Sequence, residues 1–246
     1  MKVKRYVIML AVLFFCPSLF ALTGREIIEK SDALPEPNTG ETTVLMFIHK
    51  GGRVLEKEFE GIAKKFPNNE EKMLISFVRP TRIKLLTHSH KNSDDDQWLR
   101  LSSGRIKRIA ATEKDKPFVH SHFYYEDLQS RDIDEYDYQY IGDGQAAGFS
   151  CYKVESVKKG GQKVYDKSIL YVRKSDYFIV RIDLYRKGVF DKYLVNYDIK
   201  KVSGILTPFR SVMYKADGSG NTELKLKSVK YNIGISSFKF NKEALR

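Results

Sequence analysis

The chain has 246 residues, of which 42% are hydrophobic, and a formal net charge of +12 at pH 7. This length suits a single β domain, and two cysteines are too few for a disulfide-stabilised scaffold. The positive charge fits either attraction to anionic lipid head groups or an ordinary solvated surface. The lysines are spread along the chain instead of gathering in one arm, and the leader described next argues against a nucleic-acid partner.

The first residues have the pattern of a cleavable secretory signal peptide. A basic segment at residues 2–5 precedes an unbroken apolar run at residues 6–15, and Ala21 is a suitable last residue before cleavage. The apolar run is too short for a comfortable transmembrane span. Phe14 and Phe15 stand where a lipid-modified cysteine would need small residues before it. We therefore predict an unlipidated protein exported to the periplasm, with residues 1–21 as its signal peptide.

Residues 22–246 are then predicted to form one domain. Thr23 and Glu26 have the spacing of a capping box, so a short helix is expected to follow. Ile27 and Ile28 give this helix an apolar stripe, which we expect to pack against a sheet. Cys151 is the only cysteine left in this domain, so the exported protein has no internal disulfide.

Most of the remaining chain alternates between apolar and polar residues. The segment Tyr177–Tyr185 is the best example, because Val180, Ile182 and Leu184 fall on one face of an extended strand. Short turns separate such segments from Thr43 to Asn232, which predicts an antiparallel meander of about ten or eleven strands. A meander of this length tends to curl into a closed or half-closed barrel. Pro208 lacks a backbone N–H and is expected at an edge or a bulge.

The strand pattern fails between residues 111 and 134. Aromatic side chains, among them Phe118, Phe123 and Tyr124, stand here in a stretch rich in charge and turn residues. Such a stretch between two runs of strands is a candidate lid or plug over a sheet.

Several short motifs in this part of the chain resemble the outer-membrane lipoprotein-sorting family, the LolA-like periplasmic carriers. They are, in chain order, Asp96-Gln97-Trp98-Leu99, Arg105-Ile106-Lys107-Arg108-Ile109, Phe118 with Phe123-Tyr124-Tyr125-Glu126-Asp127-Leu128, Phe190-Asp191-Lys192 and Gly204-Ile205-Leu206-Thr207-Pro208. The resemblance covers residues 72–246, and the earlier part matches only in outline. The chain departs from the family pattern in two places: His120 and His122 stand where the family tends to have Gly and Asp, and Leu101-Ser102 stands where a Leu-Pro pair is expected.

The resemblance implies a mainly β (α+β) fold, an incomplete antiparallel β-barrel with a helical lid around an apolar cavity for acyl chains. Alternation assigns the cavity wall to Met46, Leu55, Phe59, Ile75, Phe77, Trp98, Val180, Ile182 and Leu184. The lid is assigned to Ile27 and Ile28 of the first helix and to Phe118, Phe123, Tyr124 and Leu128. The expected cargo is a lipidated protein or a lipid, carried by a monomer. An inner-membrane transporter or an outer-membrane acceptor would be its partner. The alternatives are a non-enzymatic envelope structural or adhesion protein and an accessory lipid-binding partner of an inner-membrane exporter.

Metal binding and enzymatic catalysis are the two other kinds of chemistry to compare with acyl-chain binding. The pairs His88-Ser89-His90 and His120-Ser121-His122 could each present two imidazoles to Zn or Cu, but nothing in their spacing brings the pairs together. We therefore expect surface histidines and no metal site. There is no Gly-x-Ser-x-Gly elbow, no His-Glu-x-x-His and no Gly-rich phosphate loop, so we expect no catalytic residues, no enzyme and no cofactor.

Overall fold

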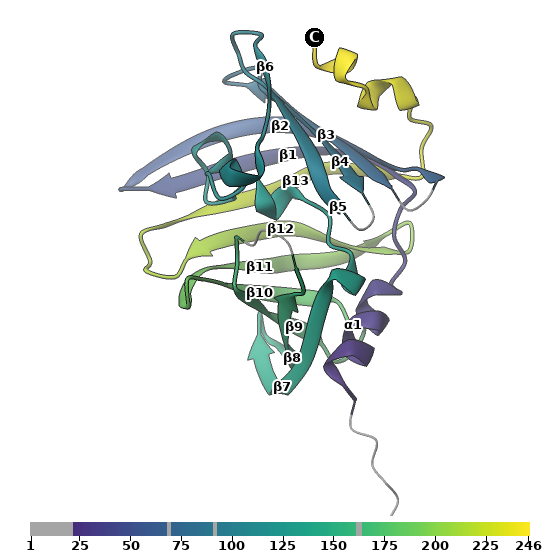
Figure 1. The fold of residues 1–246 in the computed structure, drawn as a ribbon, viewed down its shortest axis with the longest axis vertical. Coiled ribbons are helices and arrows are strands. Elements are labelled where there is room, and N and C mark those ends of the chain that lie inside the picture. Colours follow the sequence, from purple (N-terminus) through teal and green to yellow (C-terminus); the bar gives the residue numbers. More distant parts are fainter. Residues whose placement is uncertain (1–21, 68–69, 91–92, 161–163) are drawn as a thin grey trace, which may run out of the picture.

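The computed structural model describes residues 22–246 except 68–69, 91–92 and 161–163; the predicted signal peptide lies outside this part. The described strands form one antiparallel sheet in the order β6-β5-β4-β3-β2-β1-β13-β12-β11-β10-β9-β8-β7 (Figure 1). Strands that follow one another in sequence pair with each other, except β6 and β7, which lie at opposite edges, and β1 also pairs with β13 at the middle of the sheet. The first and last strands of the meander therefore meet at its centre.

The helical and extended elements have the following bounds: α1 Gly24–Asp32, β1 Thr39–Lys50, β2 Arg53–Lys65, β3 Glu71–Arg79, β4 Lys84–His90, β5 Ser93–Arg100, β6 Ile106–Arg108, β7 Tyr136–Ala146, β8 Phe149–Lys158, β9 Lys167–Arg173, β10 Ile179–Arg186, β11 Val189–Val202, β12 Ile205–Lys215 and β13 Gly220–Tyr231. Short 3-10 turns are η2 Ala111–Glu113, η3 Phe118–His120, η4 Glu126–Leu128, η5 Ile133–Glu135, η6 Ser237–Phe240 and η7 Lys242–Leu245.

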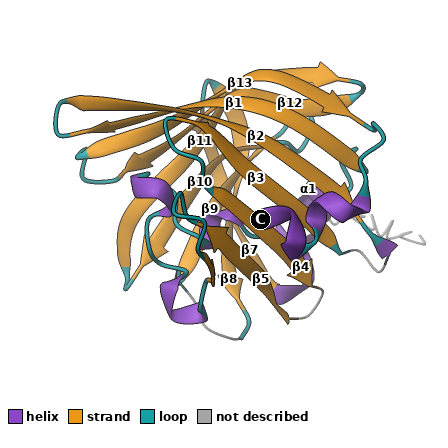
Figure 2. Cartoon of the chain, turned by 90° about the horizontal axis from the view of Figure 1, so that it is seen from above, coloured by secondary structure: helices purple, strands orange, loops and turns teal. Residues whose placement is uncertain are grey.

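The predicted mainly β, antiparallel architecture is confirmed, but the predicted count of ten or eleven strands is too low. The sheet has thirteen strands, of which the three-residue β6 is the shortest. The sheet is open, with β6 and β7 as its two edges, and it curves around the helical segments (Figure 2). Strongly twisted sheets of this size curl in this way. The curved sheet gives the molecule a concave face and an outer face.

Helix α1 begins as the sequence predicts. The Thr23 hydroxyl accepts a hydrogen bond from the Glu26 backbone N–H, and the Glu26 carboxylate accepts one from the Thr23 N–H at 2.7 Å. Ile27 and Ile28 are buried and pack on strands β8 and β9. A methyl group on Gly24 would stand 2.6 Å from the backbone nitrogen of Tyr140, so the first turn of the helix rests directly on β7.

The chain ends on the outer face of the sheet. Phe240 and Leu245, from η6 and η7, are fully buried against Leu74, Leu86 and Trp98. The C-terminal turns thereby cover the outer face of β3 to β5 (Figure 1).

Pro208 lies where the pairing of β12 is incomplete. It pairs with Ile199 of β11, next to Asp198, which has a φ of 51° and is skipped in the register. On the other side, β12 pairs with β13 only from Arg210 onward. Pro208 therefore lies at a local edge of the sheet, one of the two predicted positions, and the register with β11 has no bulge there.

Candidate functional site

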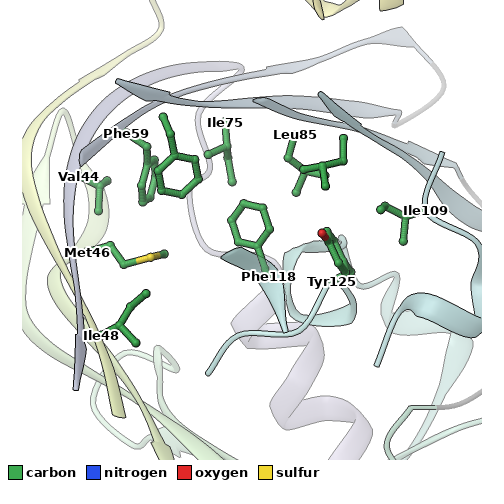
Figure 3. Close-up of a cluster of buried hydrophobic side chains, with 11 residues drawn as sticks. Val44, Met46, Ile48, Phe59, Ile75, Leu85, Ile109, Phe118 and Tyr125 are labelled. Carbon is green, nitrogen blue, oxygen red and sulfur yellow. The ribbon is translucent and has the colours of Figure 1, made fainter. Parts of the chain in front are cut away.

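The concave face of the sheet is filled on one side by an inserted segment. We call residues 117–128 the plug. Its side chains Phe118 and Tyr125 point toward the inner surfaces of β1 to β5 and are 1% and 7% exposed (Figure 3). The Phe118 ring lies 5.7 Å from both the Phe77 and the Tyr125 ring centroids. Phe118 and Tyr125 are therefore packed parts of the core and do not cover an empty cavity.

A buried ion pair fixes the plug to strand β11. The Lys192 ammonium group donates to Asp127 Oδ2 at 2.6 Å and to the His122 carbonyl at 2.9 Å, and the side chain of Lys192 is fully buried. Tyr165 donates its hydroxyl hydrogen to the other Asp127 oxygen at 2.6 Å. The Lys192 nitrogen also lies 3.3 Å from the centroid of the Tyr124 ring. Burial lowers the pKa of Lys192, while the Asp127 charge opposes that shift.

Three more strands hold the plug through hydrogen bonds. Lys57 of β2 donates to the Val119 carbonyl at 2.7 Å, and the buried Gln97 amide of β5 donates to the Tyr125 carbonyl at 3.1 Å. The hydroxyl of Thr222 on β13 accepts from the His122 backbone N–H at 3.0 Å. We call the Lys192–Asp127 ion pair and these hydrogen bonds the anchor of the plug. Three of the segments that carry the family resemblance therefore meet in the anchor, namely those containing Gln97, Asp127 and Lys192.

The structure divides the predicted wall residues into several groups. Met46, Phe59, Ile75 and Phe77 are buried together against the plug. Ile182 and Leu184 also lie on the concave face, beside Phe123 and Met213. These residues were placed together by alternation, and the structure brings them to one face. Whether they contact an acyl chain remains a prediction.

Three predicted wall residues lie elsewhere. Trp98 faces the opposite side of β5 from buried Leu99 and belongs to the outer cluster under η6 and η7. Leu55 is opposite Ile48 in the register but is 54% exposed, because the β1–β2 hairpin extends beyond the packed part of the sheet. The placement of Val180 is also wrong, since a bulge between Ile179 and Arg181 interrupts the alternation.

The bulge accounts for the position of the Val180 side chain. It packs with Cys151 and Ala146 in a separate cluster. Ile179 pairs instead with Val172 and joins the group beneath α1. A bulge adds one residue to one strand and cannot be detected from alternation alone.

The predicted lid residues are also split. Ile27 and Ile28 lie in the helix cluster on β8 and β9. Phe118 and Leu128 belong to the plug cluster, Phe123 packs on Leu184 and Met213, and Tyr124 stacks on Tyr165 with ring centroids 6.4 Å apart. The part of the chain described contains one α-helix, and the plug contributes only 3-10 turns.

Two cavities lie on the concave face, one beside the plug and one beside the end of α1 and the linker that follows it, and Ile182 lines both of them. The smaller, of about 150 Å³, is bordered by charged and apolar side chains, including Arg131, Asp127, Phe123 and Leu194. The larger, of about 540 Å³, lies beneath the linker that leads from α1 to β1. Its wall is made by Leu34, Pro35, Gly40, Gly61, Ala63, Met73, Ile179, Ile182, Ile205 and Tyr231, among others.

Sequence reasoning missed most of the larger cavity. It comes from small residues on β1 and β2, such as Gly40 and Ala63, and from a linker that carries two prolines. Gly61 has no room for a side chain, because a methyl group there would stand 2.8 Å from the Thr42 hydroxyl oxygen. Small residues within strands were the available signal, since they often mark a site where something approaches the sheet closely.

Charged groups ring this larger cavity at the linker end. Lys65 forms an ion pair with Glu36 at 2.5 Å, and the Asn38 N–H donates to the Asn232 side chain at 2.9 Å. Burial raises the pKa of the Glu71 carboxyl group. The mouth is polar and the wall behind it is largely apolar, which is the arrangement of a site for an amphipathic ligand.

The candidate metal residues have separate surroundings. The His88 ring approaches the Phe240 carbonyl at 2.7 Å, and His90 lies 3.2 Å from Asp96. The His122 ring lies 2.8 Å from the Thr222 hydroxyl, and His120 is exposed. No group of three or more His, Cys, Asp or Glu residues suited to a metal occurs among the described residues. Burial raises the pKa of the Cys151 thiol, which suits a packed side chain.

Within residues 22–246 as described, no helix is long and apolar enough to cross a membrane. The fold and its concave site instead define a class of structure seen in other proteins. A DUF1329 family protein from Desulfovibrio piger is 29% identical, with a TM-score of 0.86 and coverage of 91% of this chain and 98% of that one. A structure described as an outer membrane lipoprotein-sorting protein domain from Vibrio parahaemolyticus is 25% identical, with a TM-score of 0.85 and coverage of 90% and 97%.

A LolA superfamily protein from Nitrosomonas europaea has the same fold at 16% identity, with a TM-score of 0.71 and coverage of 91% of this chain and 100% of that one. The class is therefore the LolA-like fold, and the resemblance to lipoprotein-sorting proteins is confirmed. A family model described as "-like: Uncharacterized protein" matches residues 69–246, and the chain belongs to that family. None of the curated proteins matches the chain.

Proposed function

We propose that this protein is a periplasmic carrier or chaperone that binds acyl chains of lipoproteins or lipids and passes them toward the outer membrane. The observation that carries the proposal is the cavity of about 540 Å³ on the concave face, with its apolar wall and polar mouth. A cavity of this size falls within the usual range for ligand sites. Burying an acyl chain gains roughly 0.8 kcal/mol per CH₂ group, so no chemical step is needed to hold the cargo.

The linker end is the proposed entrance for the cargo. The plug is held by a buried ion pair and by hydrogen bonds from four strands, and these contacts oppose its displacement. The linker is held by one backbone hydrogen bond, from the Lys65 N–H to the Asn38 carbonyl at 2.8 Å, by the exposed Lys65–Glu36 pair and by the Asn38–Asn232 hydrogen bond. Exposed pairs contribute only about 0–1 kcal/mol, so the linker is the easier part to move. Cargo then occupies the space between the plug and α1, beside Ile182.

Cavity filling tests this proposal. Ala63 lines the larger cavity from β2, so Ala63→Phe should occupy the space that an acyl chain would take. The matched control is Ala111→Phe, which places the same side chain at an exposed position in η2. We expect the unmodified protein to bind a fluorescent fatty acyl probe and to carry lipid detectable by mass spectrometry. Ala63→Phe should lose at least about tenfold in probe affinity, which corresponds to about 1.4 kcal/mol.

The control variant Ala111→Phe should bind the probe as tightly as the unmodified protein. Absence of both lipid and probe binding in the unmodified protein would refute an acyl carrier and favour an envelope structural or adhesion protein. If lipid is bound, cross-linking from the linker in living cells separates two roles. Cross-links to an outer-membrane acceptor support transfer, and cross-links only to an inner-membrane exporter support an accessory lipid-binding role.

A further inference from the structure

Three hairpin turns lie along one end of the curved sheet. They join β1 to β2, β10 to β11 and β12 to β13, and they stand side by side at the left of Figure 1. The register explains their alignment, because Lys50 at the β1–β2 turn pairs with Gly220 at the β12–β13 turn. Lys192 near the start of β11 pairs in the same way with Lys215 at the end of β12. We call this end of the sheet the hairpin edge.

The hairpin edge exposes apolar side chains that nothing in the described chain covers. Val189 is 66% exposed, Val54 55% and Leu55 54%, which places all three among the most exposed large hydrophobic side chains of the described residues. Val54 and Leu55 follow the tight turn Gly51-Gly52, in which both glycines have positive φ, so they stand at the tip of a projecting hairpin. Val189 is the first residue of β11 and directly follows Gly188 in the turn of the β10–β11 hairpin.

Basic side chains flank each of these apolar residues. Lys50 and Arg53 frame the first turn, and Lys187 precedes Val189 in the second; all three are exposed. Much of the negative charge at this end is already offset. Glu56 pairs with Arg79 at 3.3 Å, while Asp191 pairs with Lys215 and Asp115 with Arg186. Two carboxylates here are exposed: Asp217 in the third turn, and Asp166, which accepts a hydrogen bond from the Gly188 N–H, against the three exposed basic side chains. The hairpin edge therefore carries net positive charge together with exposed apolar side chains.

We propose that the hairpin edge docks on a membrane surface that contains anionic lipids. Lys50, Arg53 and Lys187 would contact the lipid phosphates, and Val54, Leu55 and Val189 would enter the boundary between head groups and acyl chains. Apolar side chains beside Lys and Arg are the combination that holds a protein in this interfacial plane. An acidic protein surface would use the positive charge but would leave the separate apolar tips without a place to insert. The docking does not depend on a bound cargo.

Vesicle co-sedimentation tests the docking. The protein is prepared by export to the periplasm, with its N-terminus sequenced to establish that the apolar leader has been removed. We expect binding to vesicles of phosphatidylcholine with phosphatidylglycerol, weak binding to phosphatidylcholine alone, and loss of binding at high salt. Each basic residue near an anionic surface contributes about a fivefold factor, so the triple variant Lys50→Gln/Arg53→Gln/Lys187→Gln should partition about 100-fold more weakly.

Two controls separate docking from diffuse attraction. The triple variant Lys200→Gln/Lys201→Gln/Lys230→Gln removes the same charge from exposed positions toward the other end of the sheet and should bind almost normally. Val54→Ser/Leu55→Ser should weaken binding, whereas Phe238→Ser, at another exposed apolar residue, should not. Equal binding to phosphatidylcholine alone, or equal loss in the control triple, would overturn the proposal. Retained acyl-probe binding in the hairpin-edge variants would show that docking and cargo binding are separate.

Discussion

The two halves of the concave face are filled in different ways. Beneath β1 to β5 lies the plug, whose aromatic rings pack on the sheet and whose backbone is tied down by buried polar groups such as Lys192 and Gln97. Beneath β7 to β10 lies helix α1, which packs through Ile27 and Ile28. Its ionic contacts are exposed, as in the pair between Arg25 and Asp134 at 2.6 Å. The plug half is held by specific buried contacts, and the helix half by apolar packing.

This difference indicates which part of the molecule can move. Removing one partner of a buried pair leaves an uncompensated charge, which makes partial release of the plug costly. Sliding a helix or its linker over an apolar surface leaves no such charge behind. Ile182 lines both cavities, of which one borders the fixed plug and the other borders the end of the less constrained helix. A carrier built in this way would change shape on the helix side.

The largest expected effect comes from breaking the anchor of the plug. Asp127→Asn leaves the fully buried Lys192 without its carboxylate. We expect a loss of about 3–5 kcal/mol in the free energy of unfolding, measured by urea denaturation. Glu36→Gln, which breaks the exposed pair with Lys65, should cost at most about 1 kcal/mol.

A double substitution checks the physical cause. Asp127→Leu/Lys192→Met removes both charges and should recover most of the stability, because an apolar replacement of a buried pair is often nearly neutral. If Asp127→Asn cost no more than Glu36→Gln, the anchor would be irrelevant to stability and the contrast between the two halves would fail.

The second prediction concerns the helix half. A methyl group on Gly24 would stand 2.6 Å from the Tyr140 nitrogen and 2.7 Å from the Gln139 carbonyl carbon. Helix propensity alone favours alanine by about 1 kcal/mol. We nevertheless expect Gly24→Ala to destabilise the protein by about 1–3 kcal/mol, because β7 backbone atoms cannot move aside as a flexible side chain would.

Thermal unfolding measures this effect, and Gly160→Ala is its control, since nothing lies within 4 Å of the added methyl group. A stabilised Gly24→Ala variant would mean that α1 does not rest on β7. Hydrogen exchange should also show faster exchange in α1 and β7 of Gly24→Ala while the plug half stays protected.

Much of this architecture could be predicted from the sequence, because alternation and turn residues act locally. The capping box at Thr23, the antiparallel meander and the irregular pairing at Pro208 all follow from local rules. The inward faces of β1 to β3 were also predicted, since residues such as Met46 and Phe77 keep strict alternation.

What failed depended on contacts between distant residues. The bulge beside Val180 and the outer cover over Trp98 are set by neighbouring strands and by the C-terminal turns. The segment containing Asp127 and the one containing Lys192 were both part of the family resemblance, but their sequence separation hid the ion pair between them. The larger cavity was missed for the same reason, because its wall combines the linker with strands from both halves of the sheet.

Acid should weaken the plug half before the helix half. All five histidines lie between residues 49 and 122, and none is in α1 or β7 to β13. Burial lowers the pKa of His122 below its ordinary value of 6.5, and Lys50, Lys192 and Lys215 lower it further. Burial likewise lowers the pKa of His88. The unfolded chain therefore takes up protons first as the pH falls.

The contribution that the neutral His122 and His88 make to the free energy of unfolding is fully present above pH 6.5. It is lost as the pH falls from there toward the lowered pKa values of the folded protein. We expect hydrogen exchange to accelerate in residues 117–128 on moving from about pH 7.5 to about pH 5.5, while α1 changes less. His122→Gln should reduce the acid-induced fall in melting temperature. An equal fall in His122→Gln and in the unmodified protein would assign the acid sensitivity to other groups.

The smallest expected effect tests whether the plug is held in place against backbone strain. His120 stands where the family tends to have Gly, and it adopts a φ of 67°, in the left-handed region. That conformation costs a residue with a Cβ atom about 1–2 kcal/mol, whereas glycine adopts it freely but loses about 0.5–1 kcal/mol more backbone entropy on folding. His120→Gly should therefore stabilise the protein by about 0.5–1 kcal/mol in urea denaturation. His120→Ala removes the exposed imidazole but keeps the Cβ atom, so it should bring no gain. If His120→Gly and His120→Ala were equally stable, any change in the free energy of unfolding would come from the imidazole and not from the backbone. The anchor would then hold the plug without strain at this turn.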